Sequence, residues 1–402
     1  MLGPAQRLLP RSPMTPRAAV STAFFCQGFA FAALVTRIPA LADRFGFSEG
    51  QLALLLAVVP IVAGLGSVAA GALSVRFGSR RLLRWCAVLV ATALVAVGAA
   101  PTVPTLVAAL VALGVGLGSV DATMNMQGIA VQALLRRSVM ASFHAWWSLA
   151  AILGALLASV AAGTSGPLVA FFAAIAAVLI PIGLIASRGY VRSATADSAG
   201  PDPLATSSVP WRPLLVFFAA VVAAFVIDSS VSNWSALDLT DVLGASESVA
   251  ALAYAAYAVC LLVGRSVTDR IVIRTGAPMV IAGAGTLTAA GLVMVAVAPT
   301  SLFAIAGFAV VGVGISPILP LAFVAAAEHD PAGTGIAVAR VNVGNYVGFV
   351  LGAPLVGIIG EVWNLRVGFA VLVAVALCIV ACARAFAPAA PESAPVQPGP
   401  IG

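Results

Sequence analysis

The chain consists of long apolar runs separated by short polar turns. Because a membrane-spanning helix needs about 20 apolar residues, these runs predict twelve spans. The turns between the runs are too short to hold a soluble domain, and Pro317 and Pro320 predict a kink in the tenth run. The predicted spans are 18–41, 50–74, 82–100, 104–127, 139–162, 166–187, 213–236, 248–269, 277–298, 301–326, 334–358 and 366–386.

The composition agrees with a polytopic membrane protein, because 62% of the residues are hydrophobic and 8% are charged. The net charge of +6 comes from 20 basic residues, all arginine, against 14 acidic ones. Only Arg37, Arg44 and Arg366 fall in segments on the side of the membrane opposite the N-terminus. Cytoplasmic loops are enriched in arginine. We therefore expect both termini to be cytoplasmic, in the plasma membrane of a bacterium, and the charge needs no nucleic-acid partner.

The sequence repeats itself with an offset of 198 residues, so that Gly78 matches Gly276 and Gly154 matches Gly352. One register that holds from the first loop to the eleventh run predicts two related six-helix bundles. The expected fold is thus an all-α polytopic membrane protein with two pseudo-symmetric halves. The predicted parts are an N-terminal bundle at 1–187, a cytoplasmic linker at 188–212, and a C-terminal bundle at 213–402 that ends in a disordered, proline-rich tail.

The turn between the second and third predicted spans reads GALSVRFGSRR. This segment resembles G-x-x-x-D-R-x-G-x-R-R, the loop signature of the major facilitator superfamily. The matching residues are Gly71, Arg76, Gly78, Arg80 and Arg81, whereas Val75 stands where the family has an acid. In that family the loop latches the two halves on the cytoplasmic side. The resemblance implies the family's fold and a first-half latch that lacks its acid; the looser second-half counterpart contains Asp269.

Three shorter motifs resemble the fucose permease-like branch of this superfamily. They are Asp121-Ala-Thr-Met-Asn125 in the fourth span, Arg37-Ile-Pro39 at the end of the first, and Ser142-Phe-His144 at the start of the fifth. The resemblance implies a secondary active transporter that works by alternating access. Its expected cargo is a small polar solute, with sugars among the candidates, and its expected driving force is a proton gradient.

Asp121 is the residue on which the predicted mechanism depends, because a carboxylate inside a membrane span is costly and marks a functional site by default. A helix rise of about 1.5 Å per residue places Asp121 in the cytoplasmic third of its span, level with His144 and Arg340. We therefore predict that these three residues form a proton-coupling gate, in which withdrawal of Arg340 changes the proton affinity of the carboxyl. The alternatives are a static ion pair for Asp121 and a packing role for His144.

Polar residues in several other spans predict a solute site between the halves. Rings of a sugar stack on aromatic side chains, and amides bind its hydroxyls. Trp146 and Trp147 are adjacent, so only one of them can line the site. For the amides the alternative is hydrogen bonding between helices. The predicted substrate-binding residues are Gln27, Asn125, Trp146, Asp228, Asn233, Asn342, Asn345 and Tyr346.

Other functions are disfavoured by the absence of their motifs. The five cysteines lie in apolar runs without a CxxC pair, which disfavours disulfides and metal sites. No nucleophile motif, metal spacing or phosphate loop accompanies the acidic residues, so we expect neither an enzyme nor a cofactor. A sensor would need a soluble output domain. A proton-driven exporter of drugs or other amphipathic compounds remains as an alternative, and we expect a functional monomer.

Overall fold

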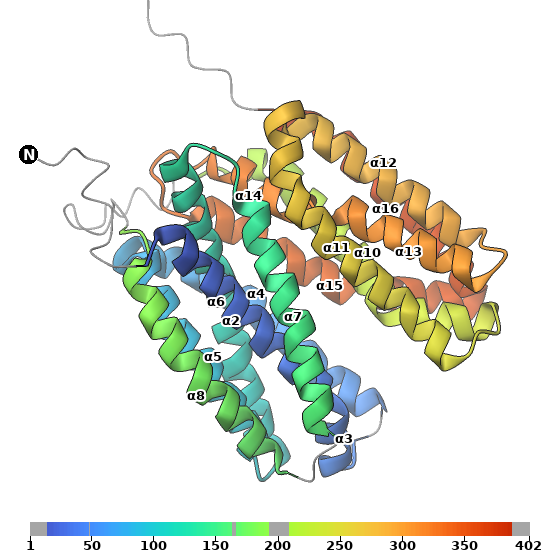
Figure 1. Ribbon diagram of the computed structural model, residues 1–402, viewed down its shortest axis with the longest axis horizontal. Helices are drawn as coiled ribbons and strands as arrows, with labels where there is room; N and C mark the ends of the chain where they lie inside the picture. The colour runs from blue at the N-terminus through green and yellow to red at the C-terminus, as the bar shows by residue number, and fades with distance from the viewer. Residues whose placement is uncertain (1–13, 48, 163–165, 193–208, 388–402) are drawn as a thin grey trace, which may run out of the picture.

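The computed structural model describes residues 14–47, 49–162, 166–192 and 209–387, and these residues are almost entirely helical (Figure 1). The first half contains α2 (Pro16–Thr36), α3 (Ile38–Phe45), α4 (Glu49–Phe77), α5 (Ser79–Ala99), α6 (Val103–Leu135), α7 (Met140–Ala162), α8 (Leu168–Ala186) and the single turn η1 (Ser187–Gly189). The second half contains α10 (Trp211–Leu237), the π-helical turn η2 (Asp238–Val242), α11 (Glu247–Thr275), α12 (Ala277–Ala296), α13 (Ser301–Ile315), α14 (Ile318–Ala327), α15 (Ile336–Val362), α16 (Leu365–Cys382) and η3 (Ala383–Phe386).

Within the described residues, eleven helical segments are long and apolar enough to cross a membrane. The remaining predicted span, 248–269, is α11, a helix of similar length that carries Arg265 and Asp269. The predicted kink in the tenth run is confirmed, because α13 ends at Ile315 and α14 begins at Ile318, directly after Pro317. All twelve predicted runs are therefore helical in the structure.

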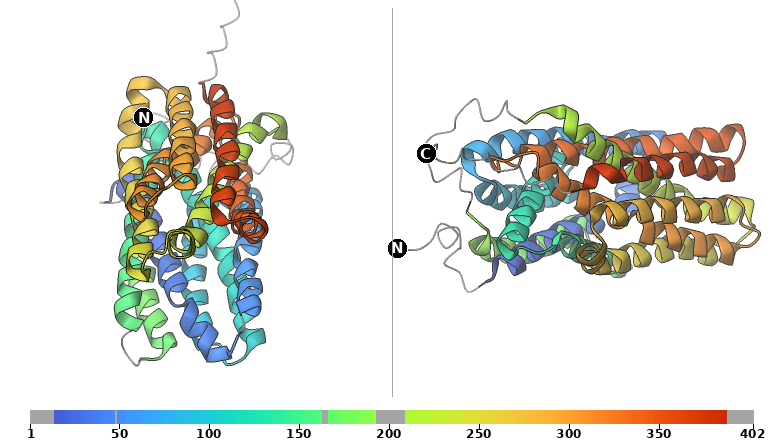
Figure 2. Two further views of the ribbon diagram at one scale, coloured as in Figure 1. Left: turned by 90° about the vertical axis from the view of Figure 1, so that its right-hand side faces the viewer. Right: turned by 90° about the horizontal axis from the view of Figure 1, so that it is seen from above.

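The helices form two bundles that meet at one end and diverge toward the other (Figures 1 and 2). In the first bundle α2 packs on α7 and α4 on α6, and in the second α10 packs on α15 and α11 on α13. The bundles contact each other mainly through two seams, α4 against α15 and α7 against α11, with smaller contacts of α6 and α7 against α14. We call the end where α6 stops and α7 and α15 start the joined end, and the opposite one the far end.

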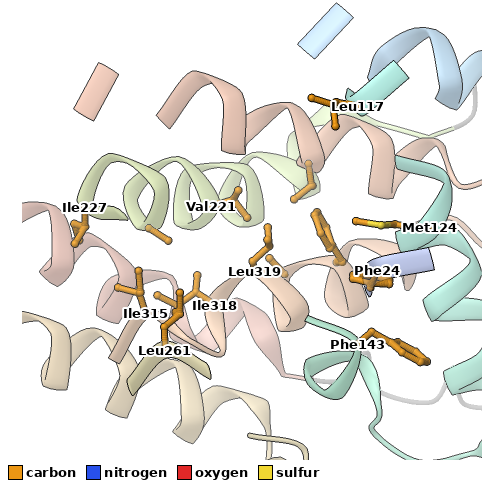
Figure 3. Packing of buried hydrophobic residues seen from close by; sticks show 14 of the residues in the cluster. Phe24, Leu117, Met124, Phe143, Val221, Ile227, Leu261, Ile315, Ile318 and Leu319 are labelled. Carbon is orange, nitrogen blue, oxygen red and sulfur yellow. The ribbon is translucent and has the colours of Figure 1, made fainter. Parts of the chain in front are cut away.

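Glycine allows the helices within each bundle to approach closely, as is common where helices associate in membranes. A Cβ added to Gly154 of α7 would lie 2.7 Å from the backbone oxygen of Phe29, and one added to Gly352 of α15 would lie 2.9 Å from Cβ of Ser229. The repeat thus places equivalent glycines in equivalent helix contacts. Buried apolar residues of both halves form one continuous cluster, and Figure 3 shows part of it, from Phe24 and Phe143 in the first half to Ile227 and Ile315 in the second.

Several helix boundaries differ from the sequence prediction, and two of the differences matter for the site. The first predicted span breaks at Arg37, so that α2 ends at Thr36 and α3 starts at Ile38. Helix α6 continues to Leu135, well past the predicted end at 127, and Asp121 therefore lies near its middle. Residues 193–208 and 388–402 lie outside the described residues, so the predicted disorder of the linker and tail, and the division at 187 and 213, remain predictions.

Candidate functional site

Asp121 is held from both halves of the protein. Gln27 of α2 donates a hydrogen bond from Nε2 to Oδ1 of Asp121 at 2.9 Å. Tyr346 of α15, in the second half, donates its hydroxyl to Oδ2 of the same carboxylate. In the described part of the chain both donors to this carboxylate are neutral. The carboxylate therefore connects the two halves. Among the described residues, no cationic side chain donates a hydrogen bond to it.

Trp147 extends this cluster on the side of α7. Its indole Nε1 donates to Oε1 of Gln27, and its ring lies 5.9 Å from that of Phe31. The Gln27 amide thus accepts from the indole and donates to Asp121, which determines its orientation. Trp146 is 46% exposed and meets the edge of Phe25. Trp147, and not Trp146, is therefore the tryptophan that joins the Asp121 cluster, and the substrate-binding role of Trp146 stays a prediction.

The predicted amides lie in the α4–α15 seam. Asn342 donates to Oγ of Ser67 at 3.0 Å, and Asn345 donates to Oδ1 of Asn342 at 3.1 Å. The Ser67 hydroxyl in turn donates to the backbone oxygen of Ala339 at 3.2 Å. Asn342 is completely buried. The Asn342 amide thus makes a hydrogen bond between helices, which was the alternative to solute binding.

Two amide oxygens near this seam have no partner. Asn125 donates to the backbone oxygen of Asp121 at 2.8 Å, but its own Oδ1 is buried without a donor, as is Oδ1 of Asn345. A buried acceptor left unpaired costs about 1–3 kcal/mol. Each oxygen is therefore a position where a hydroxyl of water or of a solute would be stabilising.

Asp228 of α10 is the centre of a second polar cluster, which lies inside the second half. Tyr257 of α11 donates its hydroxyl to Oδ1 of Asp228. Arg265, two turns further along α11, interacts with Asp228 electrostatically. Asn233 does not join this cluster, because its amide donates to the backbone oxygen of Ser229 at 2.7 Å.

Arg265 connects this second cluster to the first half. Its Nη1 donates to Oγ of Ser148 in α7 at 2.6 Å, and Ser148 donates to the backbone oxygen of His144 at 3.2 Å. The His144 ring lies 5.0 Å from Phe24, edge to face, and 6.1 Å from Phe323. These aromatic contacts fit the packing alternative for His144, although its Nε2 is buried without a partner.

Asp269 of α11 caps the first turn of α7 across the same seam. Its Oδ1 accepts from the hydroxyl of Ser138 at 2.6 Å and from the backbone N–H of Ala141 at 3.3 Å. Its Oδ2 accepts from the backbone N–H of Ser142 at 2.9 Å. A helix N-terminus has free N–H groups and favours a negative charge. Here the cap comes from the other half of the protein, so it joins the halves as well as starting the helix.

The two seams use repeat-equivalent positions with different chemistry. Gly71 and Asp269 are 198 positions apart, and so are Ala141 and Ala339. In one seam a Cβ on Gly71 would lie 2.8 Å from Cβ of Ala339, whereas in the other Asp269 binds the N–H of Ala141. The acid that the loop signature leads one to expect at Val75 is absent from the first seam, and the second seam has an acid of its own.

The remaining residues of the loop motif shape the turn into α5. Gly78 has a φ of 77°, as has the equivalent Gly276 at 81°, and each precedes the first residue of the next helix. Residues other than glycine rarely adopt such backbone angles. Arg76 lies over the ring of Phe77 at 5.3 Å. Arg81 is exposed, and Arg80 is partly buried.

The predicted gate of Asp121, His144 and Arg340 is not assembled in this structure. Arg340 donates to the backbone oxygen of Val209 and lies over the ring of Trp211 at 5.1 Å. The depth estimate was wrong because α6 is longer than its apolar run: Asp121 lies in mid-helix, whereas His144 and Arg340 lie in the second turns of α7 and α15. Among the described residues, Tyr346 takes the place across the seam that was predicted for Arg340.

Gln127, another polar residue of α6, makes its hydrogen bonds within the protein. Its amide donates to Oγ of Ser79 at 2.8 Å and to the backbone oxygen of Val191 at 3.1 Å, and it accepts from the N–H of Val191 at 2.8 Å. Both N–H groups and the oxygen of this amide are therefore engaged within the first half, and two of the three bonds hold Val191 in the chain that leaves α8. Together, Gln127 and Arg340 anchor the two described ends of the linker to opposite halves.

Comparison with known proteins identifies the family. The sequence profile of the Major Facilitator Superfamily matches residues 20–236 and 216–401. The chain belongs to the major facilitator superfamily. The resemblance seen in the loop signature is confirmed, and the protein is a multi-pass membrane transporter, not an enzyme.

Three relatives in this superfamily cover most of the chain. An uncharacterised MFS-type transporter of Yersinia pestis is 30% identical over 90% of this chain and 94% of its own length. An uncharacterised transporter of Sinorhizobium fredii is 29% identical over 89% of this chain and 95% of its own length. The membrane protein MosC of Rhizobium meliloti is 31% identical over 92% of this chain and 89% of its own length.

Solved structures of major facilitator transporters share the fold. FucP in the outward conformation superposes with a TM-score of 0.76 at 14% identity, over 94% of this chain and all of that one. The proton:xylose symporter XylE, bound to 6-bromo-6-deoxy-D-glucose, superposes with a TM-score of 0.71 at 15% identity, over 91% of this chain and 94% of that one. These likenesses show that the chain has the fold of these transporters.

Several contacting residues were not predicted from the sequence. Tyr257 and Ser148 are single polar residues in apolar runs, and nothing in the local pattern distinguishes them from packing residues. Arg265 could have been found, because it is a charge inside a predicted span and aligns at the 198-residue offset with Ser67, which also lies in a seam. Their roles depend on which residues face the other half.

Proposed function

We propose that this transporter imports a small polar solute together with protons, and that Asp121 is the coupling residue. The observation that carries the proposal is that one carboxylate accepts hydrogen bonds from both halves, through Gln27 and Tyr346. Alternating access requires such inter-half contacts to break and reform. A group whose charge alters the strength of one of these contacts can couple protonation to the conformational change.

The distribution of arginine supports an outward-facing assignment for this conformation. The turns at the joined end contain the arginine pairs Arg80-Arg81 and Arg136-Arg137, whereas Arg37 and Arg366 lie at the far end. The positive-inside rule makes the joined end cytoplasmic. The halves would then be closed on the cytoplasmic side and would diverge toward the outside.

Protonation of Asp121 would weaken the joined end. A hydrogen bond to a charged group contributes about 1.5–3 kcal/mol, whereas a neutral one contributes about 0.5–1.5 kcal/mol. The bond from Tyr346 therefore loses about 1 kcal/mol when the carboxylate is protonated, which is about a fivefold change in an equilibrium. A proton arriving from outside would favour opening at the cytoplasmic side, and its release there would restore the closed state.

The polar groups around Asp121 suit a hydroxylated solute. Trp147 and Phe31 offer aromatic faces, and the unpaired oxygens of Asn125 and Asn345 offer acceptors. FucP and XylE are described as fucose:proton and proton:xylose symporters, which supports sugars as the first class to screen. An exporter of amphipathic compounds is disfavoured, because the partly accessible residues here include two carboxylates, Asp121 and Asp228.

Proteoliposomes test the proposal directly. Purified protein is screened for uptake of radiolabelled sugars and sugar acids with and without an inward proton gradient, and the solute that accumulates is used thereafter. Asp121→Asn is expected to abolish gradient-driven accumulation while exchange of internal for external solute continues, because exchange needs no net proton movement. Tyr346→Phe is expected to reduce the accumulation ratio by about fivefold.

The matched control is Asp43→Asn, which changes an exposed carboxylate of α3 and is expected to leave both activities intact. Gradient-driven accumulation by Asp121→Asn protein would show that the coupling proton binds elsewhere. Efflux of dyes in place of sugar uptake would favour the exporter.

A further inference from the structure

Arg265 is a buried charge whose hydrogen-bonding capacity is only partly used. The side chain is 8% exposed, and its Nη1 donates to Ser148 across the α7–α11 seam. Its Nε is buried without any hydrogen-bond partner. A guanidinium has five N–H donors in a planar fork, and a buried charge is stable only when such donors are satisfied. The site is therefore incomplete as it stands.

Asp228 carries the charge opposite to that of Arg265 but leaves Nε of Arg265 without a hydrogen-bond partner. It interacts with Arg265 electrostatically, but one of its oxygens accepts the hydroxyl of Tyr257. Asp228 of α10 is partly accessible, whereas Arg265 is buried on α11, two turns past the Tyr257 that bonds Asp228. Within the described part of the chain, the guanidinium fork is thus not hydrogen-bonded to a carboxylate, although its geometry matches one.

A second unpaired group lies on the other side of the same seam. His144 is 5% exposed and its Nε2 has no partner. It precedes Ser148 by one helical turn, and residues four apart lie on one helix face. Arg265 is joined to this turn of α7 through Ser148, whose hydroxyl accepts from Arg265 and donates to the backbone oxygen of His144. Two buried side chains on opposite sides of the α7–α11 seam, one from each half, therefore have nitrogen atoms without partners.

We propose that Arg265 binds the carboxylate of the transported solute, a hydroxylated organic acid such as a sugar acid, and that Asp228 neutralises Arg265 while the solute is absent. This inference rests on the proposed transport function and adds the chemical class of the solute. Nε–H of Arg265, and Nε2 of His144 in the tautomer that protonates this nitrogen, would supply the donors that a carboxylate occupies. Because those two residues belong to different halves, the bound acid would contact both.

The charge balance fits proton coupling at Asp121. In the empty site the negative charge of Asp228 offsets the positive charge of Arg265. A bound carboxylate adds one negative charge, and one proton taken up by Asp121 restores the balance. One anion and one proton would then move together, and the cycle would transfer no net charge. Uptake should depend on the proton gradient but not on membrane potential.

Binding of matched solute pairs tests this inference. Purified full-length protein in lipid nanodiscs is titrated by calorimetry with glucuronate against glucose, and with galacturonate against galactose, at one pH and ionic strength. At least one acid is expected to bind ten times or more tightly than its neutral counterpart. Arg265→Gln is expected to lose that acid binding by at least tenfold, and Arg265→Lys to retain part of it because the charge is kept.

Asp228→Asn is the decisive second variant. Removing a competing carboxylate should tighten acid binding several-fold, whereas loss of a merely structural residue would weaken it. Arg270→Gln, an exposed arginine one turn further along α11, is the control and should leave binding unchanged.

The inference is overturned if the neutral sugars bind as tightly as the acids, if none of the acids binds, or if acid binding survives Arg265→Gln. Weaker acid binding by Asp228→Asn protein would overturn the role given to Asp228. Proton-driven uptake of a neutral sugar that depends on Asp121 would reject this inference and leave the proposed function standing. Loss of all proton-driven uptake would reject the proposed function itself.

Discussion

The cap that Asp269 places on α7 leads to a quantitative prediction for the conformational equilibrium. Its carboxylate accepts from Ser138 at 2.6 Å, from the N–H of Ala141 at 3.3 Å and from the N–H of Ser142 at 2.9 Å. These donors belong to the first half, so all three bonds must break when the joined end opens. Whatever free energy they contribute therefore favours the closed joined end over the open one.

The magnitude follows from the two parts of the interaction. Loss of a helix N-cap costs about 0.5–2 kcal/mol, and loss of a charge near a helix N-terminus costs about 0.3–1 kcal/mol. Asp269→Ala removes both, which amounts to about 2 kcal/mol, or about a thirtyfold shift toward the open joined end. Asp269→Asn keeps an acceptor but removes the charge, so we expect a shift of about fivefold.

Distances between spin labels measure this shift. In a cysteine-free background, one label pair is placed at exposed positions of the joined end, Leu135 and Ile273, and another at the far end, Val160 and Leu252. Pulsed electron resonance of the Asp269→Ala protein should show a longer joined-end distance and a shorter far-end distance, with Asp269→Asn between it and the unaltered protein.

The control is Asp241→Asn, since Asp241 is exposed and accepts a hydrogen bond from the adjacent Thr240. Unchanged distance distributions in Asp269→Ala would refute the reasoning, because the cap would then contribute equally to both conformations. A change in Asp241→Asn of the same size would show that the effect is one of surface charge.

Three further predictions concern stability and the solute site. Gln127→Leu should lower the thermal midpoint of unfolding by several degrees with little change in KM, because about 1–3 kcal/mol is lost for each buried group left unpaired. An unchanged midpoint would show that the hydrogen bonds of Gln127 to Ser79 and Val191 do not stabilise the protein. Gly118→Ala should strongly reduce the yield of folded protein, because its Cβ would lie 2.8 Å from Cα of Ala63, whereas Gly183→Ala, with nothing within 4 Å, should not; equal yields would contradict the packing. Trp147→Phe should raise the KM for the transported solute about tenfold, whereas Trp146→Phe should not; transport assays showing the reverse would return Trp146 to the site.

The arrangement of spans was predictable because it depends on local composition. A run of about 20 apolar residues has few alternatives to a membrane helix, and the 198-residue repeat places Gly78 and Gly276 in the same turn with the same left-handed backbone. Asp121 was identified for the same reason, since a carboxylate inside an apolar run is visible in the sequence alone and marks a functional site by default. Its partner was not predictable, because the choice between Arg340 and Tyr346 depended on the length of α6.

The sequence by itself determined a two-bundle membrane protein with an acidic residue in its fourth span, and the resemblance of its loop signature to the superfamily indicated a transporter. Hydrophobic length, arginine asymmetry and internal repetition are properties of the chain, and each has a direct structural consequence. Only the tertiary structure decided which side chains meet across the seams, including Tyr346 with Asp121, Arg265 with Ser148, and Asp269 with the start of α7. Helix rotation and depth determine these contacts, and an error of one or two turns in either is enough to change the partner of a buried charge.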